Sequence, residues 1–209
     1  MIVLLSIGAS AACAGDQPGA GTAGGESAAA PGRPRVVAQP SADTPEAAFP
    51  VVEDLVIEAT DLADQLFQDP TVVDGGDADA LLRRFSEIYT ADSPTPQGVV
   101  AQLHTLSASG QRYRPGPSGR LRDVGVYRMT TIDGDQVAFR VCAVEDVEIV
   151  DTAGTVVGRR SQVTQGDGWA ERSDGVWRFA GIDPDETATL PIAPGSAPSG
   201  FCDQLLGGP

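Results

Sequence analysis

The chain has 209 residues, a length that suits one domain with accessory segments. Its 14 basic residues, all of them arginine, stand against 29 acidic residues, so the formal net charge is −15 at pH 7. Because such a charge repels phosphate groups and the arginines are scattered, the composition argues against nucleic acid and anionic lipid head groups as partners.

Residues 1–13 predict an export signal that ends at a lipidation site. Their apolar run is too short to span a bilayer, which needs about 20 residues, and it ends in small residues as a cleavage site does. The basic stretch that normally precedes such a run is missing. The run leads into Cys13 and resembles the signal of bacterial lipoproteins, although Ser10 stands where leucine is usual. The alternative is ordinary cleavage after Ala11 or Ala12, which leaves a free Cys13.

The three cysteines support the lipoprotein interpretation. If Cys13 carries a lipid, Cys142 and Cys202 are left to form a disulfide in an oxidising compartment. That bridge would close a loop of about 60 residues and contribute about 4 kcal/mol in the chain-entropy model. The alternative is two unpaired buried thiols. We therefore expect an exported protein that is lipid-anchored to the outer face of the cell membrane and meets the membrane through this anchor only.

Residues 14–43 predict a disordered tether rich in Gly, Ala and Pro. They contain almost no large apolar side chains, so they cannot bury enough surface to offset the entropy lost on ordering. A flexible tether of about 30 residues has a root-mean-square span near 30 Å. That span is enough to hold a folded domain away from the membrane.

Three helices are expected next in the chain. The first has Thr44 as its N-cap, is restarted by Pro50 and ends before residues 69–70, because its apolar residues recur with a period of 3.6. The second is expected over residues 79–89. The third is expected to begin at residue 95 and to stop at a glycine, residue 110.

Beyond residue 119 the sequence predicts antiparallel strands. A strand over 121–132 meets a two-residue hairpin turn at residues 133–134. Further strands are expected over 137–144, 147–150, 155–172, where Gly166 and Gly168 suit a bulge, and 176–182. The tail, residues 185–209, is expected to be irregular and to be held to the sheet by Cys202.

Helices followed by an antiparallel meander predict an α+β domain over residues 44–184, with the N-terminal helices packed on one face of a strongly bent sheet. The helix pair ending near Tyr89, the run of hairpins and the closing motif Asp174-Gly175-Val176-Trp177-Arg178-Phe179 resemble the NTF2-like (cystatin-like α+β cone) superfamily. The resemblance spans roughly residues 46–184. It implies a cone in which some members, such as ketosteroid-isomerase-like and polyketide-cyclase-like enzymes, hold a catalytic pocket, while many others have no known catalysis.

Few residues suit catalysis. The single histidine, His104, is expected on the surface of the third helix, which excludes a Ser-His-Asp triad elsewhere and a multi-histidine metal site. A buried carboxylate would be a candidate general base. The carboxylates of the strand region are expected instead to be solvated turn and edge residues: Asp123, Glu145, Asp146 and Glu148.

Two further groups of residues could contact a ligand. An aromatic set is a candidate lining for a pocket: Tyr127, Trp169 and Phe139. A basic set around Tyr113 is expected to be a solvated loop, with an anion or an acidic partner as the alternative: Arg112, Arg114, Arg120 and Arg122.

The leading functional hypothesis is an exported envelope lipoprotein whose non-catalytic domain binds a protein partner, a second copy or an apolar small ligand. One alternative is an isomerase- or cyclase-type enzyme with a buried, paired carboxylate, which a pocket filled by aromatic side chains would count against. Another alternative is a structural spacer. No cofactor, metal or nucleic acid is expected.

Overall fold

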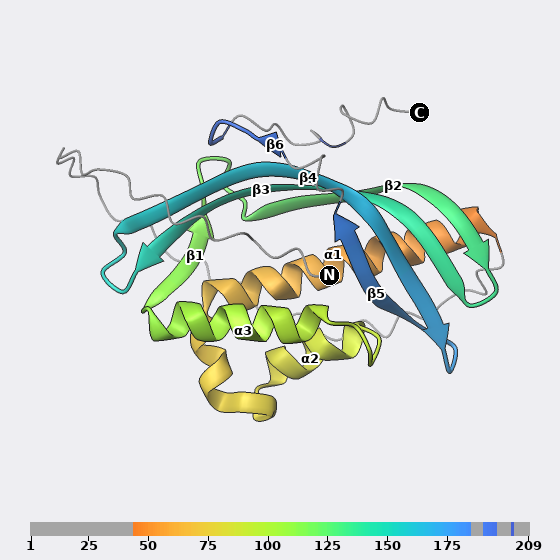
Figure 1. Ribbon diagram of the computed structural model, residues 1–209, viewed down its shortest axis with the longest axis horizontal. Helices are drawn as coiled ribbons and strands as arrows, with labels where there is room; N and C mark the ends of the chain where they lie inside the picture. The colour runs from red at the N-terminus through yellow and green to blue at the C-terminus, as the bar shows by residue number, and fades with distance from the viewer. Residues whose placement is uncertain (1–43, 185–189, 196–201, 203–209) are drawn as a thin grey trace. The chain divides into compact units, whose positions relative to one another are not determined.

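The computed structural model describes residues 44–184, 190–195 and 202 (Figure 1). In these residues a helical layer precedes an antiparallel sheet. The helices are α1 (Pro45–Gln68), the 3₁₀ segment η1 (Pro70–Ala78), α2 (Ala80–Ile88) and α3 (Thr95–Ala108). The strands are β1 (Gln111–Pro115), β2 (Arg122–Asp133), β3 (Gln136–Asp151), β4 (Val156–Ser173), β5 (Val176–Pro184) and β6 (Leu190–Pro191). Within this part of the chain, no helix has both the length and the apolar character that a membrane span needs.

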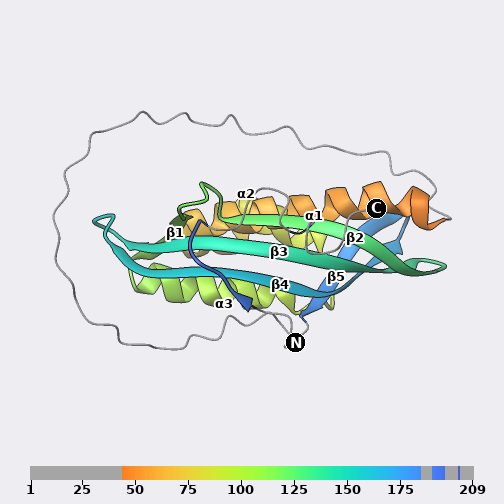
Figure 2. The same cartoon turned by 90° about the horizontal axis from the view of Figure 1, so that it is seen from above.

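The sheet is built around β3. Strand β4 pairs with nearly the whole of β3, so β1 and β2 share the opposite edge of β3, one after the other. Strands β5 and β6 pair with β4. The sheet arches strongly, and the three helices lie on its concave side (Figure 1, and from above in Figure 2). This arrangement confirms the expected fold class, with N-terminal helices packed on one face of a strongly bent antiparallel sheet.

The first helix is a single element. Thr44 caps it as expected, since its hydroxyl accepts a hydrogen bond from the Ala47 amide at 3.3 Å. The expectation that Pro50 restarts the helix is wrong, because α1 continues through it to Gln68. Proline lacks an N–H and so removes one hydrogen bond to the carbonyl four residues earlier. So close to the helix start, that loss does not divide α1.

The second and third helices follow the sequence closely. The Asp79 carboxylate caps α2 by accepting hydrogen bonds from the amides of Leu81 and Leu82, at 2.8 and 3.1 Å. Gly110 follows the end of α3 with a φ of +60°, which favours glycine. The segment η1 was not expected, because its acidic and glycine-rich sequence carries no helical period.

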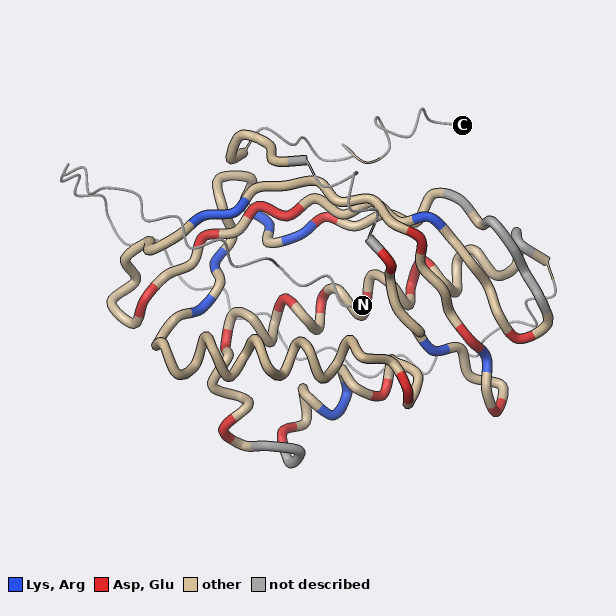
Figure 3. The backbone as a smooth tube through the Cα atoms, in the orientation of Figure 1, with Lys and Arg blue, Asp and Glu red and all other residues tan. Residues whose placement is uncertain are grey.

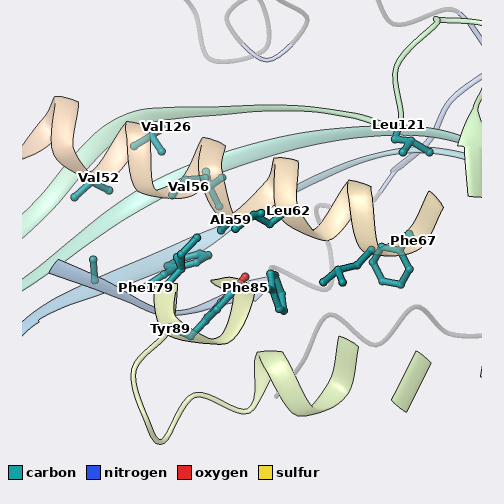
Figure 4. Packing of buried hydrophobic residues seen from close by; sticks show 14 of the residues in the cluster. Val52, Val56, Ala59, Leu62, Phe67, Phe85, Tyr89, Leu121, Val126 and Phe179 are labelled. Atoms are coloured by element: carbon teal, nitrogen blue, oxygen red, sulfur yellow. The ribbon is translucent and has the colours of Figure 1, made fainter. Parts of the chain in front are cut away.

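An aromatic core fills the space between the helices and the concave face of the sheet (Figure 4). The Phe85 and Tyr89 ring centroids are 5.0 Å apart, and Tyr89 lies 5.3 Å from Phe179. Phe179 in turn lies 6.0 Å from Phe139, which is fully buried. Trp177, only 2% exposed, belongs to the same cluster. These rings pack against one another between the helices and the concave face of the sheet.

Three features of the sheet differ from the sequence-based expectation. Strand β3 is continuous over 16 residues instead of two pieces. Strand β1 lies where the sequence predicts a loop, because Tyr113 is the one buried residue among its five and the sequence shows no apolar alternation. The irregularity between β4 and β5 falls between Trp169 and Ala170, just beyond the glycines proposed for it.

Gly168 is required by its neighbour across the sheet. It pairs with Phe139, and a Cβ atom placed at Gly168 would lie 2.6 Å from the Cζ atom of that ring. We expect Gly168→Ala to lower the free energy of unfolding by about 1–3 kcal/mol, since overpacking a filled core forces rings off their preferred rotamers. Urea denaturation measures the loss. Gly125→Ala is the control for the added methyl group, because Gly125 lies on strand β2 and a Cβ atom there would come no closer than 4.0 Å to another side chain.

A disulfide fastens the C-terminal tail to the convex face of the sheet. Cys142 and Cys202 form the disulfide that the number of cysteines predicts, with their Cα atoms 5.6 Å apart. They form a small cluster with Val144 and Val163, against which Ile192 packs. Next to it, β6 pairs with β4. Residues 190–192 and Cys202 therefore cover part of the convex face.

Candidate functional site

Two arginines and two carboxylates form a network on the concave face, beside the C-terminal half of α1. Strand register explains how they meet, since Arg122 of β2 lies opposite Glu145 of β3, which lies opposite Gln162 of β4. Arg122 bridges Glu145 at 3.2 Å and Asp64 of α1. Arg160 of β4 donates to both oxygens of Glu145, each at 2.7 Å. The tube drawing shows acidic positions along α1, and both acidic and basic positions on the strands above it (Figure 3).

Aromatic rings and an amide complete the network. The Tyr113 hydroxyl accepts hydrogen bonds from Gln102 at 2.7 Å and from Arg160 at 3.2 Å. The Tyr113 and Phe67 rings stack with centroids 4.9 Å apart. The Arg160 guanidinium lies over Tyr113 at 5.4 Å, and that of Arg122 lies over Phe67 at 5.1 Å. Each guanidinium is thus held by an acid and by the face of a ring.

The two carboxylates of the network differ in their surroundings. Glu145 is 6% exposed and accepts hydrogen bonds from Arg122, Arg160 and Gln162, which together occupy both of its oxygens. Asp64 has one charged partner. Burial raises the pKa of Asp64 to about 6, and the neighbouring Arg122 offsets only part of that effect. Asp64 can therefore change protonation near neutral pH.

Asp64 also borders a cleft of about 560 Å³. The cleft lies between α1 and the start of β2 with the loop before it. From α1 it is lined by Ile57, Thr60, Asp61, Asp64, Gln65 and Gln68, and from the other side by Pro115 and the stretch from Gly119 to Val124. Partial burial raises the pKa of Asp61, and the nearby Glu58 raises it further. The helix side of the cleft is polar apart from Ile57, and the other side carries Arg120, Arg122 and Asp123.

The stability of the domain should fall as Asp64 ionises. Its pKa is raised in the folded state, to about 6 from a usual value of 3.8, so the favourable contribution is complete below pH 3.8 and is lost as the pH rises through 6. We expect Asp64→Asn to remove this loss, which is on the order of 3 kcal/mol for a pKa that rises from 3.8 to about 6. Urea denaturation of both proteins between pH 3.5 and about pH 7.5 measures it. Parallel pH profiles of the two proteins would contradict the assignment.

The expectation that the strand carboxylates are solvated is wrong for three of them. Glu145, Asp146 and Glu148 are 6%, 3% and 8% exposed. On the convex face, Asp146 accepts hydrogen bonds from the Ser118 amide at 2.7 Å and the Ser161 hydroxyl at 2.5 Å, which hold its pKa below the usual range against the effect of burial. Polar partners converge on each acid from neighbouring strands and, for Asp146, also from the connection between β1 and β2. Only the strand register brings those partners together.

Glu148 is the second ion-pair centre of the convex face. Arg114 of β1 and Arg159 of β4 both bridge it, the latter at 2.9 Å. The hydrogen bond from Arg114 is the main reason that the pKa of Glu148 lies below its usual range. Asp123, in contrast, is about a third exposed and pairs with Arg120 at 3.4 Å.

The basic set around Tyr113 finds its acidic partners within the chain. Arg114, Arg120 and Arg122 all bridge carboxylates of the described residues, and Arg112 is exposed. The expected solvated loop is therefore strand β1 and a short connection. His104 lies exposed on α3 as expected. Among residues 44–184, 190–195 and 202, no three His, Cys, Asp or Glu side chains are close enough to hold a metal ion.

The aromatic residues suggested for a pocket lie in three different places. Phe139 is buried in the core on the concave face. Tyr127 packs against the disulfide cluster, and Trp169 is 39% exposed on β4, both on the convex face. None of them lines the cleft beside α1. Alternation along the strands separates them, because side chains of opposite parity face opposite sides of a sheet.

No family model and no curated protein matches the chain. Solved structures are similar to its fold. An NTF2-like protein with a cystatin-like fold from Novosphingobium aromaticivorans is 18% identical, with 66% of this chain and 83% of that chain covered and a TM-score of 0.37. A ketosteroid isomerase-like protein from Erwinia carotovora atroseptica is 12% identical (68% and 96% covered, TM-score 0.37). The intermembrane space region of the chloroplast protein ARC6 is 12% identical (65% and 94%, TM-score 0.40). Similarities at this level carry no argument about function.

Proposed function

We propose that the chain is an exported envelope lipoprotein whose α+β domain is non-catalytic and binds a protein partner. The observation that carries the proposal is that buried aromatic side chains pack between the helices and the sheet. Buried rings from α2, β3 and β5 occupy the space under the sheet, and Glu145, the most buried acid there, is held by two arginines. A general base needs a free carboxylate within reach of a substrate. An apolar ligand needs an interior cavity.

The export and anchoring part of the proposal rests on Cys13 and on residues 14–43, which lie outside the described residues. The disulfide between Cys142 and Cys202 is consistent with an oxidising compartment. Mass spectrometry of the chain isolated from host membranes tests it directly. A new N-terminus at Cys13 carrying a lipid supports anchoring, and loss of membrane association in Cys13→Ala confirms its cause. A lipid-free chain that begins at or next to Cys13 overturns it.

Native mass spectrometry of the full chain, extracted with its disulfide intact, tests the binding part. We expect a complex with one protein in a fixed ratio. A bare chain would favour a spacer role, and a retained lipid of defined mass would favour an apolar small ligand. The chain has no lysine, so any cross-linking before extraction must use photoreactive residues instead of amine reagents.

One observation favours an enzyme as the second candidate. Asp64 borders a cleft, and its pKa of about 6 suits a general base. The hypothesis predicts that the chain exchanges the α-protons of enolisable ketones with D₂O, measured by NMR, and that Asp64→Asn abolishes the exchange. We expect no exchange above background, because Asp64 is already bridged by Arg122.

A further inference from the structure

Strand β2 borders the cleft. Among the residues that the structure describes, β2 pairs with β3 only. Its first half, from Arg122 to Val126, pairs without interruption, whereas register shifts follow between Val126 and Arg128 and between Met129 and Thr131. Bulges of this kind protect a strand edge from further pairing. The regular stretch of five residues is thus the part of β2 that suits a further strand.

That stretch also forms one wall of the cleft. Residues 122–124 line it from the sheet, and α1 faces them with Asp61 and Asp64. A strand laid along this edge would direct every second side chain to the concave side, because side chains alternate between the two faces. Those side chains would enter the cleft toward α1. The residues that line the cleft therefore determine which side chains are favourable at alternate positions of the added strand.

The charge of α1 indicates which side chains these are. The helix has no basic residue and carries six carboxylates: Glu46, Glu53, Asp54, Glu58, Asp61 and Asp64. Asp61 makes no ion pair with a described residue, and Asp64 shares Arg122 with Glu145. On the other wall, Arg120 is already paired with Asp123. A cationic side chain is complementary to the helix wall.

We propose that the edge of β2 from Arg122 to Val126 receives an extended segment of a partner protein with arginine or lysine at alternate positions, whose cationic side chains enter the cleft beside Asp61. This inference rests on the proposed partner-binding function and adds the place and the kind of segment. Backbone hydrogen bonds to this edge supply affinity, and the cleft supplies specificity. Because the contact is a strand edge, it needs no interior cavity.

A synthetic peptide tests the inference with the full chain. The probe is a fluorescent seven-residue peptide, Thr-Arg-Val-Arg-Val-Arg-Thr, titrated by anisotropy at about 0.15 M salt, where the Debye length is about 8 Å. We expect binding that weakens with salt, and chemical-shift changes at the amides of Val124 and Gly125. A probe with N-methyl groups on every backbone amide, which has no N–H to donate to β2, and one with glutamate for arginine should both lose binding.

Substitutions on α1 locate the cationic contact. We expect Asp61→Asn to weaken binding about threefold, the effect of losing one partly exposed ion pair. Glu53→Gln removes the same charge from the same helix but lies eight residues away, about 12 Å along the axis, and should leave affinity unchanged. Equal effects of the two substitutions would reduce the contact to long-range attraction and overturn the proposal. So would failure of the unmodified probe to bind.

The inference and the proposed function can fail separately. If the envelope partner stays bound to the Asp61→Asn variant when excess peptide probe is present, the partner-binding function is supported. The edge of β2 is then not the site at which the partner binds. If no protein is retained by the wild-type chain, the partner-binding function fails, and the peptide titration still decides whether the edge accepts a basic strand.

Discussion

Replacing Glu145 by alanine should destabilise the domain by about 3–5 kcal/mol, the cost of breaking a buried ion pair and leaving its partners uncompensated. Glu145 is the common acceptor for Arg122, Arg160 and Gln162. Without it, the described residues would leave Arg160 the Tyr113 hydroxyl as its hydrogen-bond acceptor and Arg122 the Asp64 carboxylate, besides the ring that each guanidinium covers. Urea denaturation followed by far-UV circular dichroism measures the loss.

Glu148→Ala is the matched control on the opposite face. Glu148 is also buried and also bridges two arginines, but these are 48% and 56% exposed, whereas Arg122 and Arg160 are 16% and 22% exposed. Water can solvate the released arginines on the convex face, so we expect a cost of about 1 kcal/mol or less. If the two substitutions cost the same, the concave network is no more important to stability than a surface ion pair.

Loss of the disulfide should cost about 4 kcal/mol, because the bridge closes a loop between residues 60 apart and restricts the unfolded chain. The double variant Cys142→Ala with Cys202→Ala removes the bond without placing a polar group in the buried site. Its free energy of unfolding, compared with that of the oxidised wild type, gives the effect. A domain stability of 5–15 kcal/mol makes this a large fraction of the total.

Reduction of the wild-type chain distinguishes the contribution of the disulfide bond to stability from that of the packing of the two cysteine side chains. We expect the reduced chain to lose a similar free energy and to exchange amide hydrogens faster around Val144 and Val163, which pack with Cys202 in one cluster. The amides of the aromatic core, such as that of Phe139, should stay protected. A loss below about 1 kcal/mol would mean that the unfolded chain is already compact near these cysteines.

The helices and the order of the strands could be predicted because their signals are local. The 3.6-residue period of α1, the Asp79 cap and the turn after Asp133 are each contained in a few neighbouring residues. The cysteine pair was predictable for a different reason, since assigning Cys13 to a lipid left only two thiols. The same local reasoning missed β1, whose residues Arg112 and Arg114 are exposed and leave a single buried ring.

The network on the concave face could not be predicted, because it depends on register between strands. Nothing near Glu145 in the sequence identifies Arg160 as its partner, and Arg122 lies 23 residues away. The acidic run Glu145-Asp146 resembles a solvated turn until β2 and β4 are placed on either side of it. The cleft has the same origin, since α1 and β2 are separated by more than 50 residues at the point where Asp64 meets Arg122.

The contact between Phe139 and Gly168 has a consequence for the evolution of this fold. Neither position can change freely alone, because any side chain at 168 enters the space of the ring opposite. Related sequences are therefore expected to covary at these two positions, since residues in direct contact constrain each other's size. Where the glycine is replaced by alanine or a larger residue, a smaller side chain should stand in place of the phenylalanine. A relative that keeps the ring should keep the glycine.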